Sequence, residues 1–285
     1  MRYLLLPAIL TACLSFVSCH HKPTLQEMGV VLDTLTVEAS APLWVDTVET
    51  GDSVETGDSI KTVETLDSVR SPECYVSLEF ITFSNKEHLP LNDSLLRSGI
   101  LSPEYLSLTP THLSPREAVD SFIRRYITDY REFYSGIYTD EGDSAATIGY
   151  TLRTSVEEGR DSILVYKARI ANRQGSITTE YTRCVNIDLS RKRLLGLDDV
   201  FVPGATKGLE EAITAKLVKQ TDSKSIKGLH EAGFFVNSDV YPTGNFILGD
   251  KSITFVYVAG EIADREKGEI QVEVNYSDIK NLMKR

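Results

Sequence analysis

The chain has 285 residues, and its acidic side chains outnumber its basic ones, which gives a formal net charge of −11 at pH 7. Nucleic-acid binding depends on lysine and arginine, so this balance argues against a nucleic-acid partner. The same surplus of carboxylates favours solubility or a basic partner. No segment after residue 19 is long and apolar enough to cross a bilayer.

The start of the chain has the parts of an export signal. Arg2 is followed by a short apolar stretch, and the small residue Ser18 directly precedes Cys19. The ending FVSC resembles a bacterial lipobox, with Phe16 where leucine is usual. We therefore expect residues 1–18 to be a signal peptide and Cys19 to carry the lipid anchor. The alternative is an ordinary signal peptide that is cut elsewhere, with Cys19 incidental.

Residues 19–72 have the composition of a tether. The triplets GDS and VET recur in this segment, acids outnumber bases, and no helical stripe of apolar residues is present. Such a segment cannot offset the entropy lost on ordering, so we predict that it is disordered. No acidic run follows Cys19 directly, which favours the periplasm over the cell surface for this membrane-anchored chain.

Residues 73–285 are expected to form a single domain or two closely packed halves, 73–179 and 180–285. A strand at 74–83 comes first, and a short helix or turn at 91–101 follows it. The clearest helix begins at Ser114, which combines with a following proline and Glu117 in a capping-box pattern. Apolar residues then recur at helical spacing and predict one buried face.

Strands dominate the rest of the chain. Alternating patterns and glycine-containing turns predict an antiparallel meander, a second helix, and two further strands before a short final helix that Ser277 would cap. These segments are 147–156, 162–170, 177–189, the helix 206–220, 245–258 and 268–276. The predicted class is therefore α+β, with an antiparallel sheet and two or three packed helices.

Two cysteines remain in the predicted folded part, Cys74 and Cys184. An exported compartment permits a disulfide between them. They can equally be two unrelated thiols, because the sequence gives no distance. Both interpretations stay open here.

The sequence contains no convincing catalytic set and no motif for a metal or a cofactor. The HExxH, CxxC, GxSxG and GxGxxG patterns are all absent. Glu261 and Asp264 form an acid pair that could do acid–base work if their pKa values were pushed apart. The pairs Asp198–Asp199 and Glu210–Glu211 are better explained as turn and helix-start residues.

An ordered series of motifs runs through the C-terminal half. It consists of NIDLSRKRLLGLDDVF, GLHEAGFFV and PTGNFILGDKSITFVYVAGEIADREKGEIQVEVNYSDIKNLM. The series resembles the extracellular domain family shared by RsiV-type anti-sigma factors and the N-terminal region of PdaC-type peptidoglycan deacetylases. The resemblance covers residues 180–285 well and 74–180 loosely. It departs from the family at 258–260 and at 264–266, where Pro-Tyr-containing stretches are usual.

The resemblance implies an envelope-facing binding domain rather than an enzyme. RsiV-type domains are similar to lysozyme receptors, and an acidic surface would suit a basic muramidase. We take Tyr257, Glu261, Asp264 and Tyr276 as candidate binding residues. The expected ligand is a basic, lysozyme-like protein or a peptidoglycan fragment. The alternatives are a cell-wall hydrolase that uses carboxylates near Glu261, and a structural protein of the envelope.

Overall fold

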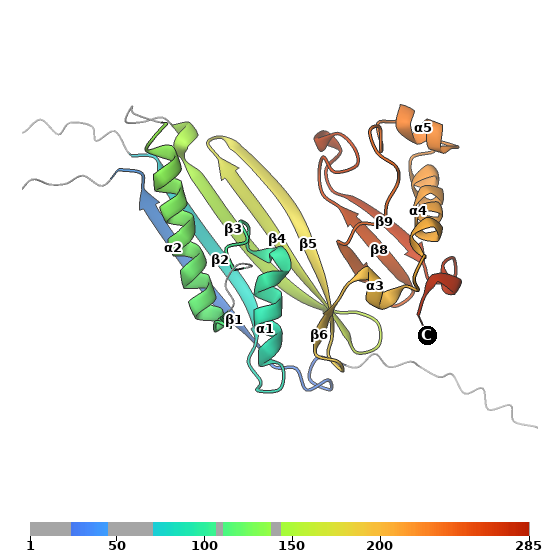
Figure 1. The fold of residues 1–285 in the computed structure, drawn as a ribbon, viewed down its shortest axis with the longest axis horizontal. Coiled ribbons are helices and arrows are strands. Elements are labelled where there is room, and N and C mark those ends of the chain that lie inside the picture. Colours follow the sequence, from blue (N-terminus) through green and yellow to red (C-terminus); the bar gives the residue numbers. More distant parts are fainter. Residues whose placement is uncertain (1–23, 45–70, 107–110, 138–143, 285) are drawn as a thin grey trace, which may run out of the picture.

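The computed structural model describes residues 24–44, 71–106, 111–137 and 144–284, and it has two β-sheets (Figure 1). The larger sheet has the order β1-β2-β3-β4-β5-β6, and the smaller has the order β7-β8-β9. The strands are β1 (Leu32–Pro42), β2 (Glu73–Phe83), β3 (Ile148–Glu158), β4 (Ile163–Gln174), β5 (Ile177–Asp188), β6 (Arg193–Leu195), β7 (Phe246–Leu248), β8 (Ser252–Tyr257) and β9 (Ile270–Asn275). The predicted α+β class is confirmed.

One pair of strands departs from the antiparallel pattern. β2 and β3 are parallel, with Cys74 opposite Ile148, whereas every other pair in both sheets is antiparallel. A parallel pair requires a crossover of a dozen residues or more. The helices α1 (Leu89–Leu95), η1 (Leu96–Ile100) and α2 (Pro115–Tyr134) lie in that crossover and cover one face of the large sheet (Figure 1).

Helix α2 begins where the sequence predicts. Ser114 and Glu117 form the capping box, in which the Ser114 N–H donates to Glu117 Oε2 at 2.9 Å. Phe122 is fully buried in the main core and packs against Tyr150 of β3, with 5.3 Å between ring centroids. The apolar stripe of α2 is therefore a core face.

The smaller sheet belongs to a second unit with its own core (Figure 1). Its helices are α3 (Leu197–Val200), α4 (Thr206–Gln220) and α5 (Ile226–Glu231), with 3₁₀ turns η3 (Arg265–Lys267) and η4 (Lys280–Leu282); a further 3₁₀ turn, η2 (Ser144–Ala146), precedes β3. The run predicted as a single strand at 245–258 is the β7–β8 hairpin. Among the described residues, no helix is long and apolar enough to cross a membrane.

Two predicted boundaries were wrong. Residues 24–44 do not belong to a tether, because β1 pairs along its whole length with β2. In β1, Leu35, Val37 and Ala39 pack against the main core, and the residues between them, Thr36 and Glu38, are exposed. The division at 179/180 falls inside β5, whereas the second unit begins only after β6. Cys19, the signal peptide and the repeats at 48–65 lie outside the described residues.

Of the two interpretations left open for the cysteines, the structure has two separate thiols. Cys74 and Cys184 are both free and buried, and strands β3 and β4 lie between the strands that carry them. Three strand spacings amount to about 14 Å, whereas a bridge needs Cα atoms within roughly 7 Å. Cys74 packs beside Tyr130 of α2, while the backbone N–H of Cys184 donates to Asn245 of the second unit.

Candidate functional site

Glu261, the leading candidate from the sequence, closes a turn. Its two carboxylate oxygens accept the backbone N–H of Val258 and the hydroxyl of Tyr241, each at 2.8 Å. The Glu261 N–H donates in turn to the Val258 carbonyl at 3.0 Å. The side chain is half-buried and holds the chain just after β8. These hydrogen bonds give the carboxylate a role in holding the fold, and that role requires no ligand.

Tyr257 is buried in an aromatic cluster next to that turn. Its hydroxyl donates to the Tyr241 carbonyl at 2.6 Å, and the rings of Phe235, Tyr241 and Tyr257 pack edge to face in all three pairs. Burial raises the pKa of Tyr257, and burial together with the Glu261 hydrogen bond raises the pKa of Tyr241 to about 12. Tyr257 therefore supports the fold and offers no exposed binding group.

The four predicted binding residues do not form one site. Asp264 is exposed and shares a hollow of about 360 Å³ with Glu261. Tyr276 lies at the other end of the small sheet, because Tyr257 pairs with Ile270 while Asn275, its neighbour, pairs with Ser252. The Tyr276 hydroxyl donates to the Gly249 carbonyl at 2.9 Å, and the Arg160 guanidinium lies 4.6 Å from its ring centroid.

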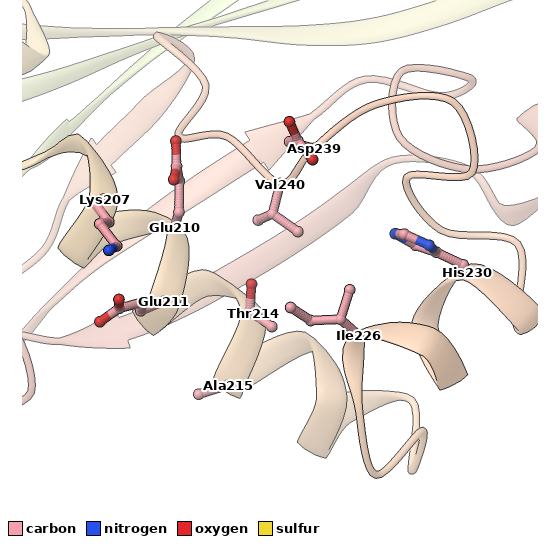
Figure 2. Close-up of a pocket in the computed structure, with 9 residues that line it drawn as sticks. All are labelled: Lys207, Glu210, Glu211, Thr214, Ala215, Ile226, His230, Asp239 and Val240. Carbon is pink, nitrogen blue, oxygen red and sulfur yellow. The ribbon is translucent and has the colours of Figure 1, made fainter.

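A larger groove lies between α4, α5 and the segment that precedes β7 (Figure 2). Its volume is about 470 Å³, which is within the range of ligand sites. Thr214 and Ile226 point toward each other across it, Val240 lies beside them, and His230 stands at one end (Figure 2). The lining residues are Lys207, Glu210, Glu211, Thr214, Ala215, Ile226, His230, Asp239 and Val240.

Local sequence explains how the two helices form this groove. Ser225 caps α5, since its hydroxyl accepts the Gly228 N–H at 3.1 Å. A Cβ at position 228 would overlap the Ser223 carbonyl, so the tight turn between α4 and α5 requires glycine there. On α4, Leu209, Ile213 and Leu217 face the core, which turns Glu210, Glu211 and Thr214 outward to the groove.

The rim of the groove is acidic and its floor is apolar. Glu210, Glu211 and Asp239 supply three carboxylates against the single ammonium of Lys207, and none of the ion pairs between described residues involves them. Ile226 is 52% exposed and contributes to this apolar lining together with Ala215 and Val240. This arrangement suits a ligand that carries both apolar and cationic groups.

Sequence reasoning missed this groove. The sequence explains Glu210 and Glu211 as favourable charges at a helix start, and this explanation requires no ligand. The sequence does contain one hint of the groove. Ile226 is an apolar residue at the first position after the cap of a short helix. No local pattern predicts that Asp239 and Val240 meet α4, because they lie about 30 residues further along the chain. Among the described residues, no three His, Cys, Asp or Glu side chains cluster as a metal site would require.

Comparison with known proteins agrees with this division of the chain. Residues 198–277 match the DUF3298 family model, described as a protein of unknown function. The match runs from α3 to just beyond β9, so it includes every residue that lines the groove. No curated protein matches the chain.

Two solved structures have the same fold. A DUF3298 family member from Bacteroides fragilis superposes with a TM-score of 0.70 at 20% identity, over 90% of this chain and 94% of that chain. A DUF3298 family protein from Pseudomonas aeruginosa superposes with a TM-score of 0.56 at 14% identity, over 90% and 96%. At these identities the likeness concerns the fold alone.

Proposed function

We propose that this chain is an exported lipoprotein, anchored through Cys19, whose folded part is a non-catalytic binding domain for a basic protein ligand of the cell envelope. The proposed location is the periplasm-facing side of a bacterial membrane. Support for export comes from the signal-like start of the chain and its lipobox-like FVSC ending. Support for binding comes from the second unit.

The observation that carries the binding proposal is the groove, whose three carboxylates make no ion pair with another described residue. Three acidic side chains stand around an apolar floor, and the chain as a whole has a net charge of −11. The negative net charge of the chain would attract a basic partner over a distance. Contact with the apolar floor of the groove would then add binding energy. The resemblance to RsiV-type domains makes a lysozyme-like protein the first ligand to test.

The hydrolase alternative lacks a supporting observation. It would need a second buried carboxylate in a cleft with Glu261, and the only other acid that lines the Glu261 hollow is the exposed Asp264. Both oxygens of Glu261 already accept hydrogen bonds. We therefore keep the binding proposal alone.

Titration calorimetry with hen egg-white lysozyme tests the proposal on the mature chain with Cys19→Ser. The triple variant E210Q/E211Q/D239N should weaken binding by about tenfold, since exposed charge pairs contribute up to about 1 kcal/mol each. Raising the salt concentration should weaken wild-type binding more than variant binding.

The matched control is E132Q/D222N/E266Q, which removes three exposed charges outside the groove. Equal loss in both triple variants would mean that net charge alone drives the association and would remove the groove from the proposal. If lysozyme does not bind but soluble peptidoglycan fragments do, the ligand class is wrong.

A further inference from the structure

A second hollow, of about 500 Å³, lies at the junction of the two sheets. Its walls come from the β3–β4 turn, the β5–β6 turn, α3, β7 and the C-terminal segment. Both units therefore contribute to it, and junctions between units are common places for ligand sites. Residues of the SRKRL and LDDVF motifs line this hollow, whereas neither motif lines the groove.

The junction hollow is locally cationic in a chain of net charge −11. Arg160, Arg191, Arg193 and Lys284 line it, against the three carboxylates of Asp161, Asp188 and Asp199. One positive charge is therefore in excess.

Arg193 and Arg191 differ in how closely their guanidinium groups approach an aspartate. Arg193 Nη1 lies 2.6 Å from Asp199 Oδ1, so this pair is close. Arg191 Nη1 lies 3.7 Å from Asp188 Oδ2, while Asp188 Oδ1 accepts the backbone N–H of Arg191 at 2.9 Å. The Arg191 side chain is 66% exposed. Its guanidinium is the one that an incoming anion can reach with the least rearrangement.

Apolar side chains form the smaller part of the exposed lining of the hollow. Ile163 and Leu195 come from the large sheet, and Val200, Leu248 and Met283 come from the second unit. Leu248 is buried, and the others are half-buried. A ligand that filled the hollow would place apolar groups on this surface and an anionic group among the arginines.

We propose that the junction hollow binds a carboxylate at the end of an apolar or weakly polar chain, either the carboxyl terminus of a short peptide or a fatty acid. A guanidinium presents paired N–H donors that match the two oxygens of a carboxylate. The five apolar side chains would contact the chain that carries it. This site is separate from the groove, so either proposal can fail without the other.

Titration calorimetry on the mature chain with Cys19→Ser, using four compounds, tests the proposal. Acetyl-trialanine should bind with a Kd below about 1 mM, and its C-terminal amide should bind at least about tenfold more weakly. Octanoate and octanol form the second pair, with the same expected difference. The acid that binds more tightly identifies the source of the carboxylate.

Lys192 provides a matched control within the same turn. Its ammonium points to Glu87, 2.8 Å away, and it does not line the hollow. R191Q should weaken binding of the acids by about tenfold, whereas K192Q should leave it unchanged. The proposal is overturned if neither acid binds at about 10 mM, if the amide binds as well as the acid, or if the two variants lose affinity equally.

Discussion

Asn186 and Asn245 join the two sheets by a reciprocal exchange of hydrogen bonds. The Asn186 amide, on β5, donates to the Phe246 carbonyl at 2.8 Å and accepts the Leu248 N–H at 2.9 Å. The Asn245 amide, just before β7, donates to the Thr182 carbonyl at 2.8 Å and accepts the Cys184 N–H at 2.7 Å on β5. Each side chain thus pairs with the backbone of the other's strand.

This exchange satisfies backbone groups that strand pairing leaves open. Edge strands expose unpaired N–H and C=O groups, and burying such groups without partners is costly. Asn186 and Asn245 are 1% and 5% exposed, so water does not reach the bonds easily. The two amides therefore hold the units together at the place where neither sheet continues.

Replacing Asn245 should destabilise the protein strongly. Asn245→Ala removes the partner of the buried Cys184 N–H and of the Thr182 and Val256 carbonyls. We expect a loss of about 3 kcal/mol in the free energy of unfolding, measured by urea denaturation. Asn237→Ala, at an exposed asparagine, is the control and should cost little. A loss below about 1 kcal/mol in N245A would contradict this role.

Gly149 and Tyr75 should show coupled effects on stability. They lie opposite each other in the parallel pair β2–β3, and a Cβ at position 149 would overlap the Tyr75 ring. Gly149→Ala should therefore cost about 1–3 kcal/mol in wild type and less in a Tyr75→Ala background. A double-mutant cycle by urea denaturation measures the difference. Strictly additive losses would mean that the ring does not occupy this space.

Asp199 should stabilise the fold in a pH-dependent way. The backbone N–H of Gly196 and the Arg193 guanidinium lower the pKa of this carboxyl below its ordinary 3.8. A depressed folded-state pKa gives stability that is present above the unfolded-state pKa and is lost as the pH falls through the folded-state pKa. Asp199→Asn should therefore be about 1 kcal/mol less stable than wild type at neutral pH, and the difference should vanish in strong acid.

Urea unfolding from about pH 7 to about pH 2 measures this convergence. Asp198→Asn, at the exposed neighbouring position, is the control and should be about as stable as wild type at neutral pH. If the D199N deficit persists unchanged into strong acid, the stabilisation comes from packing and not from the charge.

The two buried cysteines should be unreactive thiols. Burial raises the pKa values of Cys74 and Cys184 to about 12 each, so almost no thiolate forms at neutral pH. In the Cys19→Ser mature chain, Ellman's reagent should detect neither thiol until guanidinium unfolds the protein, and then both. Detection of no thiol after unfolding without reductant would show that the disulfide forms after all.

Cys19 should carry the membrane anchor. Cells that express the full chain should incorporate radioactive palmitate into it, and the protein should sediment with membranes. Cys19→Ser should abolish both results, because we propose that the lipid is attached to this cysteine thiol. The Ser18→Gly control keeps a small residue before the cysteine and should behave as wild type. Membrane association of the Cys19→Ser protein would point to a different anchor.

Local patterns predicted most of the elements. The capping box at Ser114, the alternation in β9 and the glycine turns of the β3–β5 meander are short-range features that a single segment expresses by itself. β1 lies in the segment predicted as a tether, although Leu35, Val37 and Ala39 alternate with polar residues. The acidic repeats that follow β1 give the segment as a whole the composition of a tether and obscure this short alternation.

The site predictions depended on residue types, and the sequence does not show where their side chains lie relative to one another. The sequence predicts binding roles for Glu261 and Tyr257, whereas in the structure the Glu261 carboxylate and the Tyr257 hydroxyl make hydrogen bonds within the fold. The groove and the junction hollow each collect residues from three or more segments. Their composition follows from which elements pack together, and no local spacing encodes that.

The sequence by itself determined the α+β class, the main helix with its cap and the three-strand meander, since each depends on the order of neighbouring residues. The tertiary structure decided that β2 and β3 run parallel, that Cys74 and Cys184 stay apart, and that the sheets meet through Asn186 and Asn245. These features depend on burial and pairing between distant segments. Burial and pairing act through space, so they become visible only when the chain is folded.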